Sequence, residues 1–222
     1  MIDYQMLSEG DKICVAVSGG KDSLTMLRIL QERRKFVPVK YSLLAVHVDM
    51  GYKKEHARML EKYLKKQGVE YHIEKIKLLK PGQSLKDISC FWCSWNRRKT
   101  LFQVADRLGC TKVALGHHKD DIVETILMNM FFQGEISAMK PKQELFKGKI
   151  KIIRPLAYVD EDLIIKYARS LNFPTHKCDC PNSPASMRSK MTQILKDLQK
   201  ICPEVKTNVF KSVKRIKSDY LL

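Results

Sequence analysis

The sequence predicts an α/β protein with a doubly wound, mainly parallel sheet, and two observations carry this prediction. First, continuous apolar runs typical of strands buried on both faces alternate with segments of helical period. Second, the two kinds of segment keep alternating from residue 13 to residue 130, which implies right-handed crossovers and helices on both faces of the sheet. We therefore expect a Rossmann-like fold, followed by a small helical region at the C-terminal end of the chain.

Each expected element follows from its own pattern. Strands are predicted for the apolar runs at residues 13–17, 41–49, 69–76 and 112–115. Helices are predicted where apolar residues recur every three or four positions, at residues 24–30, 57–64, 101–108, 122–130, 163–171, 194–198 and 209–213. Between Gln133 and Arg154 the periodicity fades and basic residues dominate, so we expect a basic, mobile loop beside the site.

The composition of the chain indicates which binding partners and which cellular compartment to expect. The 222 residues carry a formal net charge of +17, which concentrates polyanions and favours nucleic acid as a partner. A solvated basic surface, or attraction to anionic membranes, would account for the charge less specifically. No leader pattern opens the chain and no apolar run approaches the roughly 20 residues of a membrane span. We expect a cytoplasmic protein with no membrane partner.

The first strand runs into a glycine loop, Ser18-Gly-Gly-Lys-Asp-Ser23, and then into a helix. Glycines let backbone N–H groups approach an anion, and the helix start adds positive dipole. The loop is not the common P-loop, because that motif would need Gly at position 15 and Ser or Thr at position 22, where this chain has Val15 and Asp22. The pattern predicts a phosphate site of another kind.

Two further segments should meet this loop at the carboxyl edge of the sheet, where open α/β sheets bind ligands. Asp49 ends the strand at 41–49, and Gly116-His-His-Lys-Asp-Asp121 follows the strand at 112–115. The aspartates of this second segment have a structural alternative, which is to cap the helix that follows. For His47 we expect a packed ring whose backbone, rather than its side chain, lies near the nucleotide.

Seven cysteines in a chain with no secretory signal favour metal or catalytic use over a disulfide framework. Cys90 and Cys93 are spaced to share one face of a helix's first turn, and Cys178 and Cys180 follow in a proline-rich elbow. These residues are compatible with a four-thiolate zinc site, a redox dithiol at Cys90 and Cys93, or an iron–sulfur cluster. The other three, Cys14, Cys110 and Cys202, lie in apolar stretches, and we expect buried, inert thiols there.

The motifs SGGKDS, CFWCSWNRRKTLF, LGHHKDDIVETILMNMFFQG and IIRPLAYVDEDLI, followed by a cysteine before a basic helix, occur in one order. Together they resemble the PP-loop ATPases and, within them, the TtcA group of tRNA thiolases, from about residue 10 to residue 198. The resemblance implies cleavage of ATP between its α and β phosphates, with Mg²⁺, to adenylate a carbonyl oxygen. It also implies a 4Fe-4S cluster held by three cysteines, Cys90, Cys93 and Cys180, whose fourth iron stays open to sulfur.

The resemblance and the loop together give the expected site. The residues expected to bind the nucleotide are Ala16, Val17, Ser18, Gly19, Gly20, Lys21, Asp22, Ser23, His47, Val48, Leu115, Gly116 and His117. The residues expected to be catalytic are Asp49, Arg97, Asp120 and Asp121. Residues 1–172 are expected to form the PP-loop catalytic domain, and residues 173–222 a cysteine-containing elbow with a basic helical region.

The expected function is therefore that of an ATP-dependent tRNA thiolase acting on a pyrimidine C2 carbonyl, with cytidine in the anticodon loop as the first choice. The sulfur would come from sulfide or from a cysteine-desulfurase-derived donor, and a homodimer is expected by analogy. Trp92 and Trp95 would either stack a flipped-out base or pack in the core. Two alternatives remain open, a PP-loop thiolase for another base or small molecule, and a non-catalytic RNA-binding iron–sulfur sensor.

Overall fold

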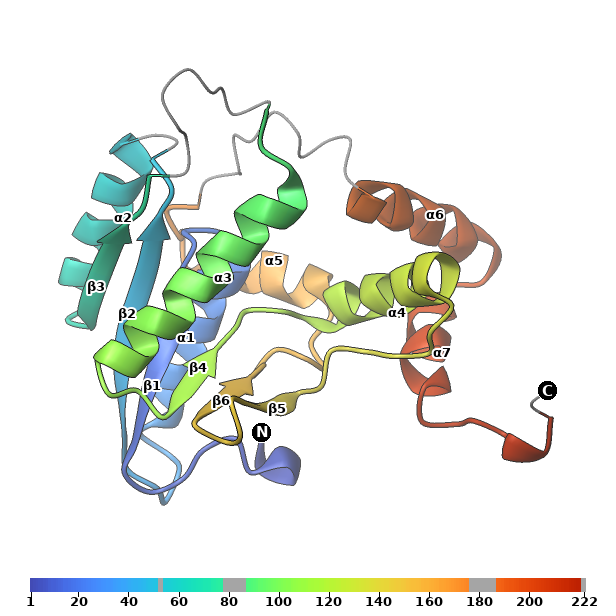
Figure 1. The fold of residues 1–222 in the computed structure, drawn as a ribbon, viewed down its shortest axis with the longest axis horizontal. Helices are drawn as coiled ribbons and strands as arrows, with labels where there is room; N and C mark the ends of the chain where they lie inside the picture. Colours follow the sequence, from blue (N-terminus) through green and yellow to red (C-terminus); the bar gives the residue numbers. More distant parts are fainter. Residues whose placement is uncertain (52–53, 78–86, 176–186, 221–222) are drawn as a thin grey trace.

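The sheet predicted from the sequence is present in a computed structural model, which describes residues 1–51, 54–77, 87–175 and 187–220. Its order is β3-β2-β1-β4-β6-β5 (Figure 1). The strands are β1 (Asp11–Ala16), β2 (Tyr41–Asp49), β3 (Glu70–Lys75), β4 (Lys112–Ala114), β5 (Lys142–Leu145) and β6 (Ile150–Ile153). Every neighbouring pair is parallel except β5 and β6, so the predicted fold class is confirmed.

Seven α-helices lie in the described part of the chain. They are α1 (Lys21–Arg33), α2 (Lys54–Lys66), α3 (Cys90–Arg107), α4 (Lys119–Gln133), α5 (Glu161–Ser170), α6 (Met187–Ile201) and α7 (Val205–Ser212). Helices α1, α2 and α5 share one apolar cluster with the sheet, and α3 shares another on the opposite face. Each helix predicted from periodicity is therefore present, and α3 begins at Cys90 as the spacing of the two cysteines suggested.

Alternation along β1 separates the two faces of the sheet. Ile13 and Val15 pack against α1, whereas Cys14 between them packs on the side of α3. All three side chains are fully buried, as expected for a central strand covered on both faces. Cys14 and Cys110 are buried as predicted, but the prediction for Cys202 is wrong, because Cys202 lies exposed just after the end of α6.

The prediction of an irregular basic loop over residues 133–154 is wrong. The segment contains the antiparallel hairpin of β5 and β6, and β6 pairs in parallel with β4. The turn carries Phe146 and Lys147 at positive φ, 52° and 57°, followed by Gly148. Bulky residues rarely adopt this left-handed conformation, so the turn has no sequence signal of the Asn-Gly kind. The hairpin nevertheless extends the sheet and brings Arg154 to its carboxyl edge.

The switch in strand order lies between β1 and β4. From β1 the chain winds to β2 and β3 on one side, and α3 then carries it across the other face to β4. The loops that follow β1 and β4 therefore diverge at the carboxyl edge and leave a crevice between them, the usual ligand position in open α/β sheets. The glycine loop and Gly116 lie at this point.

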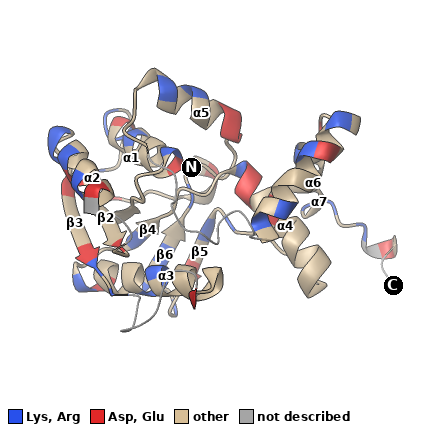
Figure 2. Cartoon of the chain, turned by 90° about the horizontal axis from the view of Figure 1, so that it is seen from above, with Lys and Arg blue, Asp and Glu red and all other residues tan. Residues whose placement is uncertain are grey.

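The C-terminal helices pack on α4, at the end of the molecule away from β3 (Figure 1). Met191 and Leu195 of α6 are buried against Val123 and Leu127 of α4. Lys and Arg are spread over many elements, including α2, α3, α5 and α6, rather than gathered at one place (Figure 2). Within the described ranges, no helix has the length and apolar character that crossing a membrane requires.

Candidate active site

A cavity of about 460 Å³ opens at the switch point. Its volume lies in the range of small-molecule sites. Fourteen of the residues expected at the site line it: Ala16, Val17, Ser18, Gly20, Asp22, Ser23, His47, Val48, Asp49, Arg97, Leu115, Gly116, His117 and Asp121. The carboxyl ends of β1, β2 and β4 and one face of α3 thus contribute to a single cavity, as parallel pairing requires.

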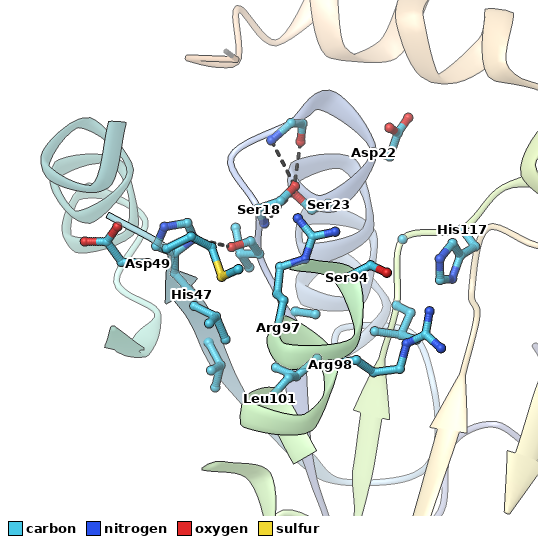
Figure 3. Close-up of a pocket in the computed structure, with 18 of the residues that line it drawn as sticks. Ser18, Asp22, Ser23, His47, Asp49, Ser94, Arg97, Arg98, Leu101 and His117 are labelled. Carbon is cyan, nitrogen blue, oxygen red and sulfur yellow. Dashed lines mark hydrogen bonds between the residues drawn. The ribbon is translucent and has the colours of Figure 1, made fainter. Parts of the chain in front are cut away.

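The glycine loop is held in shape by the hydroxyl of Ser23. Its Oγ accepts a hydrogen bond from the backbone N–H of Ser18 at 3.1 Å and donates to the carbonyl of Gly20 at 2.9 Å (Figure 3). Gly19 has φ +86°, a conformation in which glycine is unstrained. α1 begins at Lys21, within the loop, so the positive end of its dipole faces the cavity. These features fit an anion such as pyrophosphate.

Gly116 is required where β4 passes the start of α1. A Cβ on this residue would lie 3.2 Å from the backbone of Asp22 and Ser23, closer than ordinary side-chain contact. The absence of a side chain lets the segment after β4 pack against the glycine loop. The two loops therefore form one wall of the cavity.

The ring of His47 is held by a backbone carbonyl of the neighbouring strand's loop, and whether its backbone or its side chain meets the nucleotide stays a prediction. The ring Nδ1 lies 2.8 Å from the carbonyl of Val17 (Figure 3), and since a carbonyl only accepts, Nδ1 carries the proton. Burial lowers the pKa of His47 below its usual value, with a smaller contribution from Arg97. The ring is therefore neutral at pH 7, and its Nε2 remains an acceptor beside Asp49.

One face of α3 forms the opposite wall. Ser94, Arg97 and Leu101, spaced three and four residues apart, all line the cavity. Figure 3 shows the Arg97 side chain extending toward the loop of Ser18 and Ser23. Its guanidinium thus has the position expected of a group that stabilises negative charge on a bound nucleotide.

The tryptophans lie on another side of α3. At about 100° per residue, Trp92 and Trp95 are more than a quarter turn from Arg97, on the side that carries Lys99. Both rings are exposed, 43% and 49%, and the Lys99 ammonium lies 5.0 Å from the Trp95 ring centre. The rings are therefore not packed in the core, and they do not line the cavity. Stacking on a flipped-out base stays a prediction.

Gly19 and Lys21 do not line the cavity. The Lys21 ammonium is held by Glu161 at 2.8 Å and by Asp22 at 3.1 Å. Burial lowers the pKa of Lys21, but the two carboxylates outweigh it and the pKa lies above its usual value. The side chain is thus a full positive charge on the loop itself, bound to carboxylates that a phosphate would have to replace.

The two neighbouring aspartates of α4 have different surroundings. Asp121 lines the cavity, and its carboxylate accepts the backbone N–H of His118 at 3.0 Å, so it also caps the helix. Asp120 is buried behind it, where it accepts the N–H of Glu161 at 2.9 Å and pairs with Lys206 of α7. Both oxygens of Asp120 hold other elements, which is a structural role, and the catalytic role expected for it stays a prediction.

Cys90 and Cys93 lie on the first turn of α3, on the same side of the helix as Arg97. Ser89 caps this turn by accepting the N–H of Trp92 at 3.1 Å, so the thiols sit at the positive end of the helix. Cys90 is exposed and Cys93 is partly buried against the core. Two thiols at a helix N-terminus, beside Arg97 and Arg98, fit a thiolate-bound metal or cluster.

Cys180, the expected third ligand, and Cys178 lie outside the described residues. Among the residues that are described, no group of three or more His, Cys, Asp or Glu side chains is arranged to hold a metal ion. Of the three expected cluster ligands, the described residues include two, Cys90 and Cys93.

Sequence reasoning missed several lining residues: Val46, Met50, His56, Ala57, Ser94, Arg98 and Leu101. The helical spacing from Arg97 would have indicated Ser94 and Leu101. His56 and Ala57 reach the cavity because α2 packs beside β2, a tertiary contact without a local signal.

The fold and the site define a nucleotide-binding α/β protein with a glycine loop for phosphate. The PP-loop domain model matches residues 3–191. A tRNA-cytidine(32) 2-sulfurtransferase of Geotalea uraniireducens is 40% identical over 99% of this chain and 89% of its own length. One from Polynucleobacter asymbioticus is 41% identical over 99% and 74%. The chain therefore belongs to the PP-loop family and to its branch of TtcA-like tRNA thiolases, as the motifs predicted.

A solved structure agrees with this assignment. The U34-tRNA thiolase NcsA from Methanococcus maripaludis, with its 4Fe-4S cluster, is 29% identical and superimposes with a TM-score of 0.77 over 95% of this chain and 72% of that one. The phosphoadenylyl-sulfate reductase of Candida auris, at 13% identity and a TM-score of 0.52, shares the fold alone.

Proposed function

We propose that this protein is an ATP-dependent tRNA sulfurtransferase that replaces the C2 carbonyl oxygen of a cytidine in the anticodon loop with sulfur. The observation that carries the proposal is a single cavity lined by the glycine loop and by Ser94, Arg97 and Leu101 of α3, the helix whose first turn holds Cys90 and Cys93. The relatives described above, matched along nearly the whole chain, support the choice of RNA and base.

The chemistry explains why both halves of the cavity are needed. Sulfide cannot displace a carbonyl oxygen directly, because oxide is a very poor leaving group. Attack of the base oxygen on the α-phosphate of ATP releases pyrophosphate and gives an adenylate. Attack of hydrosulfide on C2 then expels AMP with the oxygen, and the sulfur loses its proton as C=S forms.

The chain's own residues have distinct roles in this scheme. The loop from Ser18 to Ser23 would hold the leaving pyrophosphate, with Lys21 exchanging its carboxylate partners for phosphate oxygens. Arg97 would stabilise charge at the α-phosphate. Asp49 and Asp121 offer hard oxygen ligands for Mg²⁺ at the cavity wall.

Cys90, Cys93 and Cys180 would hold a 4Fe-4S cluster, with the third ligand taken from the expected motif rather than from the described residues. Such a cluster, when bound, supplies an open iron that holds sulfide in its deprotonated, nucleophilic form. The sulfide would come directly from solution or from a cysteine-desulfurase-derived donor. A homodimer and a cytoplasmic location remain parts of the proposal.

Purified enzyme should be tested anaerobically with tRNA, ATP, Mg²⁺ and sulfide. We expect pyrophosphate release that depends on tRNA, and 2-thiocytidine in the nucleosides by mass spectrometry. Thiolation of a different base would select the alternative PP-loop thiolase. Tight tRNA binding without pyrophosphate release from any RNA tested would instead favour the non-catalytic sensor.

A further inference from the structure

The outer side of α3 carries exposed aromatic residues that the reaction scheme above does not use. Phe91, Trp92 and Trp95 are 77%, 43% and 49% exposed, and these two tryptophans are the only ones in the chain. In Figure 1, α3 lies in front of the sheet, and no other described helix or strand covers it. Tryptophan is highly buried on average, so two exposed tryptophans beside an exposed phenylalanine mark a binding surface.

Helical periodicity places these rings along one side of α3. At about 100° per residue, Phe91, Trp95 and Phe102 lie within about 40° of one another around the helix axis, and Trp92 lies about 60° further round. The row continues onto the hairpin of β5 and β6, where the Phe146 ring packs edge-on against Phe102 with ring centres 6.1 Å apart. We call these five residues the aromatic stripe.

The stripe is long enough for several nucleotides. From Phe91 to Phe102 the helix rises about 16 Å, which is the length of about five stacked nucleotides at the rise of roughly 3.4 Å per base of one strand.

Phe146, at the far end of the stripe, has a backbone conformation that phenylalanine disfavours. Its φ is 52°, in the left-handed region, and its ring is 62% exposed, so burial of the ring does not explain the conformation. Strained positions of this kind occur mainly at functional sites. The turn therefore presents an aromatic ring to solvent next to Phe102.

Positive charge lies along the stripe. The segment from residue 88 to residue 105 has no acidic residue, and its basic residues are Arg97, Arg98 and Lys99. The Lys99 ammonium lies 5.0 Å from the Trp95 ring centre, and Lys147 is exposed next to Phe146. Rings interleaved with cations are the pattern that binds single-stranded nucleic acid, because bases stack on the rings and phosphates meet the cations.

Arg98 connects the stripe to the cavity. Around the helix axis it lies about 20° from Phe91, on the stripe, and about 40° from Ser94, on the cavity wall, and it lines the cavity itself. None of the five stripe residues lines the cavity, so their rings do not hold the base that reacts. An RNA strand with one base in the cavity would carry its neighbouring bases over the stripe.

We propose that the aromatic stripe binds the unpaired bases next to the reacting cytidine, which stack on Phe91, Trp95 and Phe146 with a phosphate beside Lys99. The proposal deepens the proposed function and rests on it. RNA is favoured over a partner protein because cations lie between the rings, whereas the cores of protein–protein interfaces are depleted in charged residues.

The test compares Trp95→Leu, Phe91→Leu and Phe146→Leu with Phe36→Leu in the full-length protein prepared anaerobically. Phe36 is the matched control, because it is 78% exposed, follows two basic residues, and comes directly after α1, which packs on the opposite face of the sheet from α3. We would measure the affinity for an anticodon stem-loop RNA at several salt concentrations, and for a blunt duplex with the same number of phosphates. Iron content and thermal melting check each variant.

We expect Trp95→Leu to weaken binding of the stem-loop about tenfold, and Phe91→Leu and Phe146→Leu to weaken it about threefold to tenfold, as loss of one stacked base does. Trp95→Phe should restore most of the affinity, because it keeps a ring. The salt dependence should stay as in wild type, because no charge is removed. Binding of the duplex should not change.

Tryptophan fluorescence tests the stacking directly. Because the chain has two tryptophans, Trp92→Phe leaves Trp95 as the single indole. A base stacked on an indole quenches its emission, so the stem-loop should quench the fluorescence of this variant and the duplex should not. Tight binding of the stem-loop with unchanged emission would contradict the proposal.

Affinities of the three stripe variants no lower than that of Phe36→Leu would overturn the proposal, and so would equal losses for stem-loop and duplex. Phe146→Leu decides the matter if changes near Cys90 reduce the iron content, because Phe146 lies on the hairpin. Unchanged RNA affinity, with thiolation lost for a desulfurase donor but kept for sulfide, would assign the stripe to a donor protein instead.

The two proposals fail in different ways. If the wild-type enzyme thiolates tRNA and the variants bind RNA as well as wild type does, the inference about the stripe alone fails. If the wild-type enzyme neither binds nor thiolates any RNA, the proposed function fails, and this inference fails with it.

Discussion

At the scale of single residues, the hydroxyl of Ser23 stabilises the conformation of the glycine loop through two hydrogen bonds to its backbone. Replacing Ser23 with Ala removes the hydrogen bonds to the N–H of Ser18 and the carbonyl of Gly20. At about 1 kcal/mol for a net hydrogen bond, we expect Mg·ATP affinity to fall roughly tenfold. Calorimetric titration of the variant with Mg·ATP measures this directly.

Ser170→Ala is the matched control for this experiment. Its hydroxyl also donates to a backbone carbonyl, that of Tyr167 at 2.9 Å, but on an exposed turn of α5. Equal losses of ATP affinity in the two variants would show that the effect does not come from the loop.

His117 should make stability depend on pH. Burial lowers its pKa from 6.5 to about 4. Between these two pH values the side chain is therefore protonated in the unfolded chain and neutral in the folded protein. Stability is therefore full above pH 6.5 and falls as the pH decreases toward 4, by on the order of 2 kcal/mol between pH 7.5 and 5.0. In His117→Gln this part of the loss should disappear. Urea unfolding at both pH values tests the difference, and parallel losses in the two proteins would contradict it.

The residues of the cavity divide into those that sequence reveals and those that it does not. Ser18, Asp49 and Gly116 were predictable, because each lies at or just after the end of a recognisable strand and parallel strands end at one edge. Asp120 and Asp121 could not be separated, since neighbours on a helix point about 100° apart and only tertiary packing decides which one faces the cavity.

At the scale of elements, α3 carries both Cys90 and Cys93, on its first turn, and the residues Ser94, Arg97 and Leu101 that line the cavity. We expect about four iron atoms per chain after anaerobic preparation, by analogy with a cluster of this type. Cys90→Ser, Cys93→Ser and Cys180→Ser should each lose the iron, and Cys178→Ser, the matched control from the same elbow, should retain it. Iron analysis together with the visible absorption spectrum makes the measurement. Stoichiometric zinc in place of iron would contradict the expectation, and iron loss from Cys178→Ser would move the third ligand.

The hairpin of β5 and β6 shows where element prediction from this sequence ends. Its strands have only four residues each, and its turn uses Phe146 and Lys147 in a conformation that their side chains disfavour. What stabilises it is pairing with β4, a strand about forty residues earlier. The long helices, by contrast, could be predicted from the sequence, because the apolar residues of each stripe lie within one short segment of the chain.

At the scale of the whole molecule, Asp120 ties the nucleotide-binding sheet to the C-terminal helices. Burial raises the pKa of this carboxyl, but the hydrogen bonds from Lys206 and from the N–H of Glu161 outweigh it, so the pKa lies below its usual value. Nearby, Lys119 of α4 bonds Asp160 at 2.8 Å and Thr207 at 3.1 Å. No local pattern predicts these contacts, because their partners are 41 to 88 residues apart.

Lys206→Met tests this connection. The change leaves the buried Asp120 carboxylate without its cation, which should cost about 3 kcal/mol of unfolding free energy. Amide hydrogen exchange should accelerate in α7 more than in β1. The double variant Asp120→Asn with Lys206→Met should recover much of the loss, because it removes both charges.

Lys211→Met, on an exposed position of the same helix, is the matched control and should have little effect. A loss in Lys211→Met as large as that in Lys206→Met would show that α7 depends on its charge rather than on this contact.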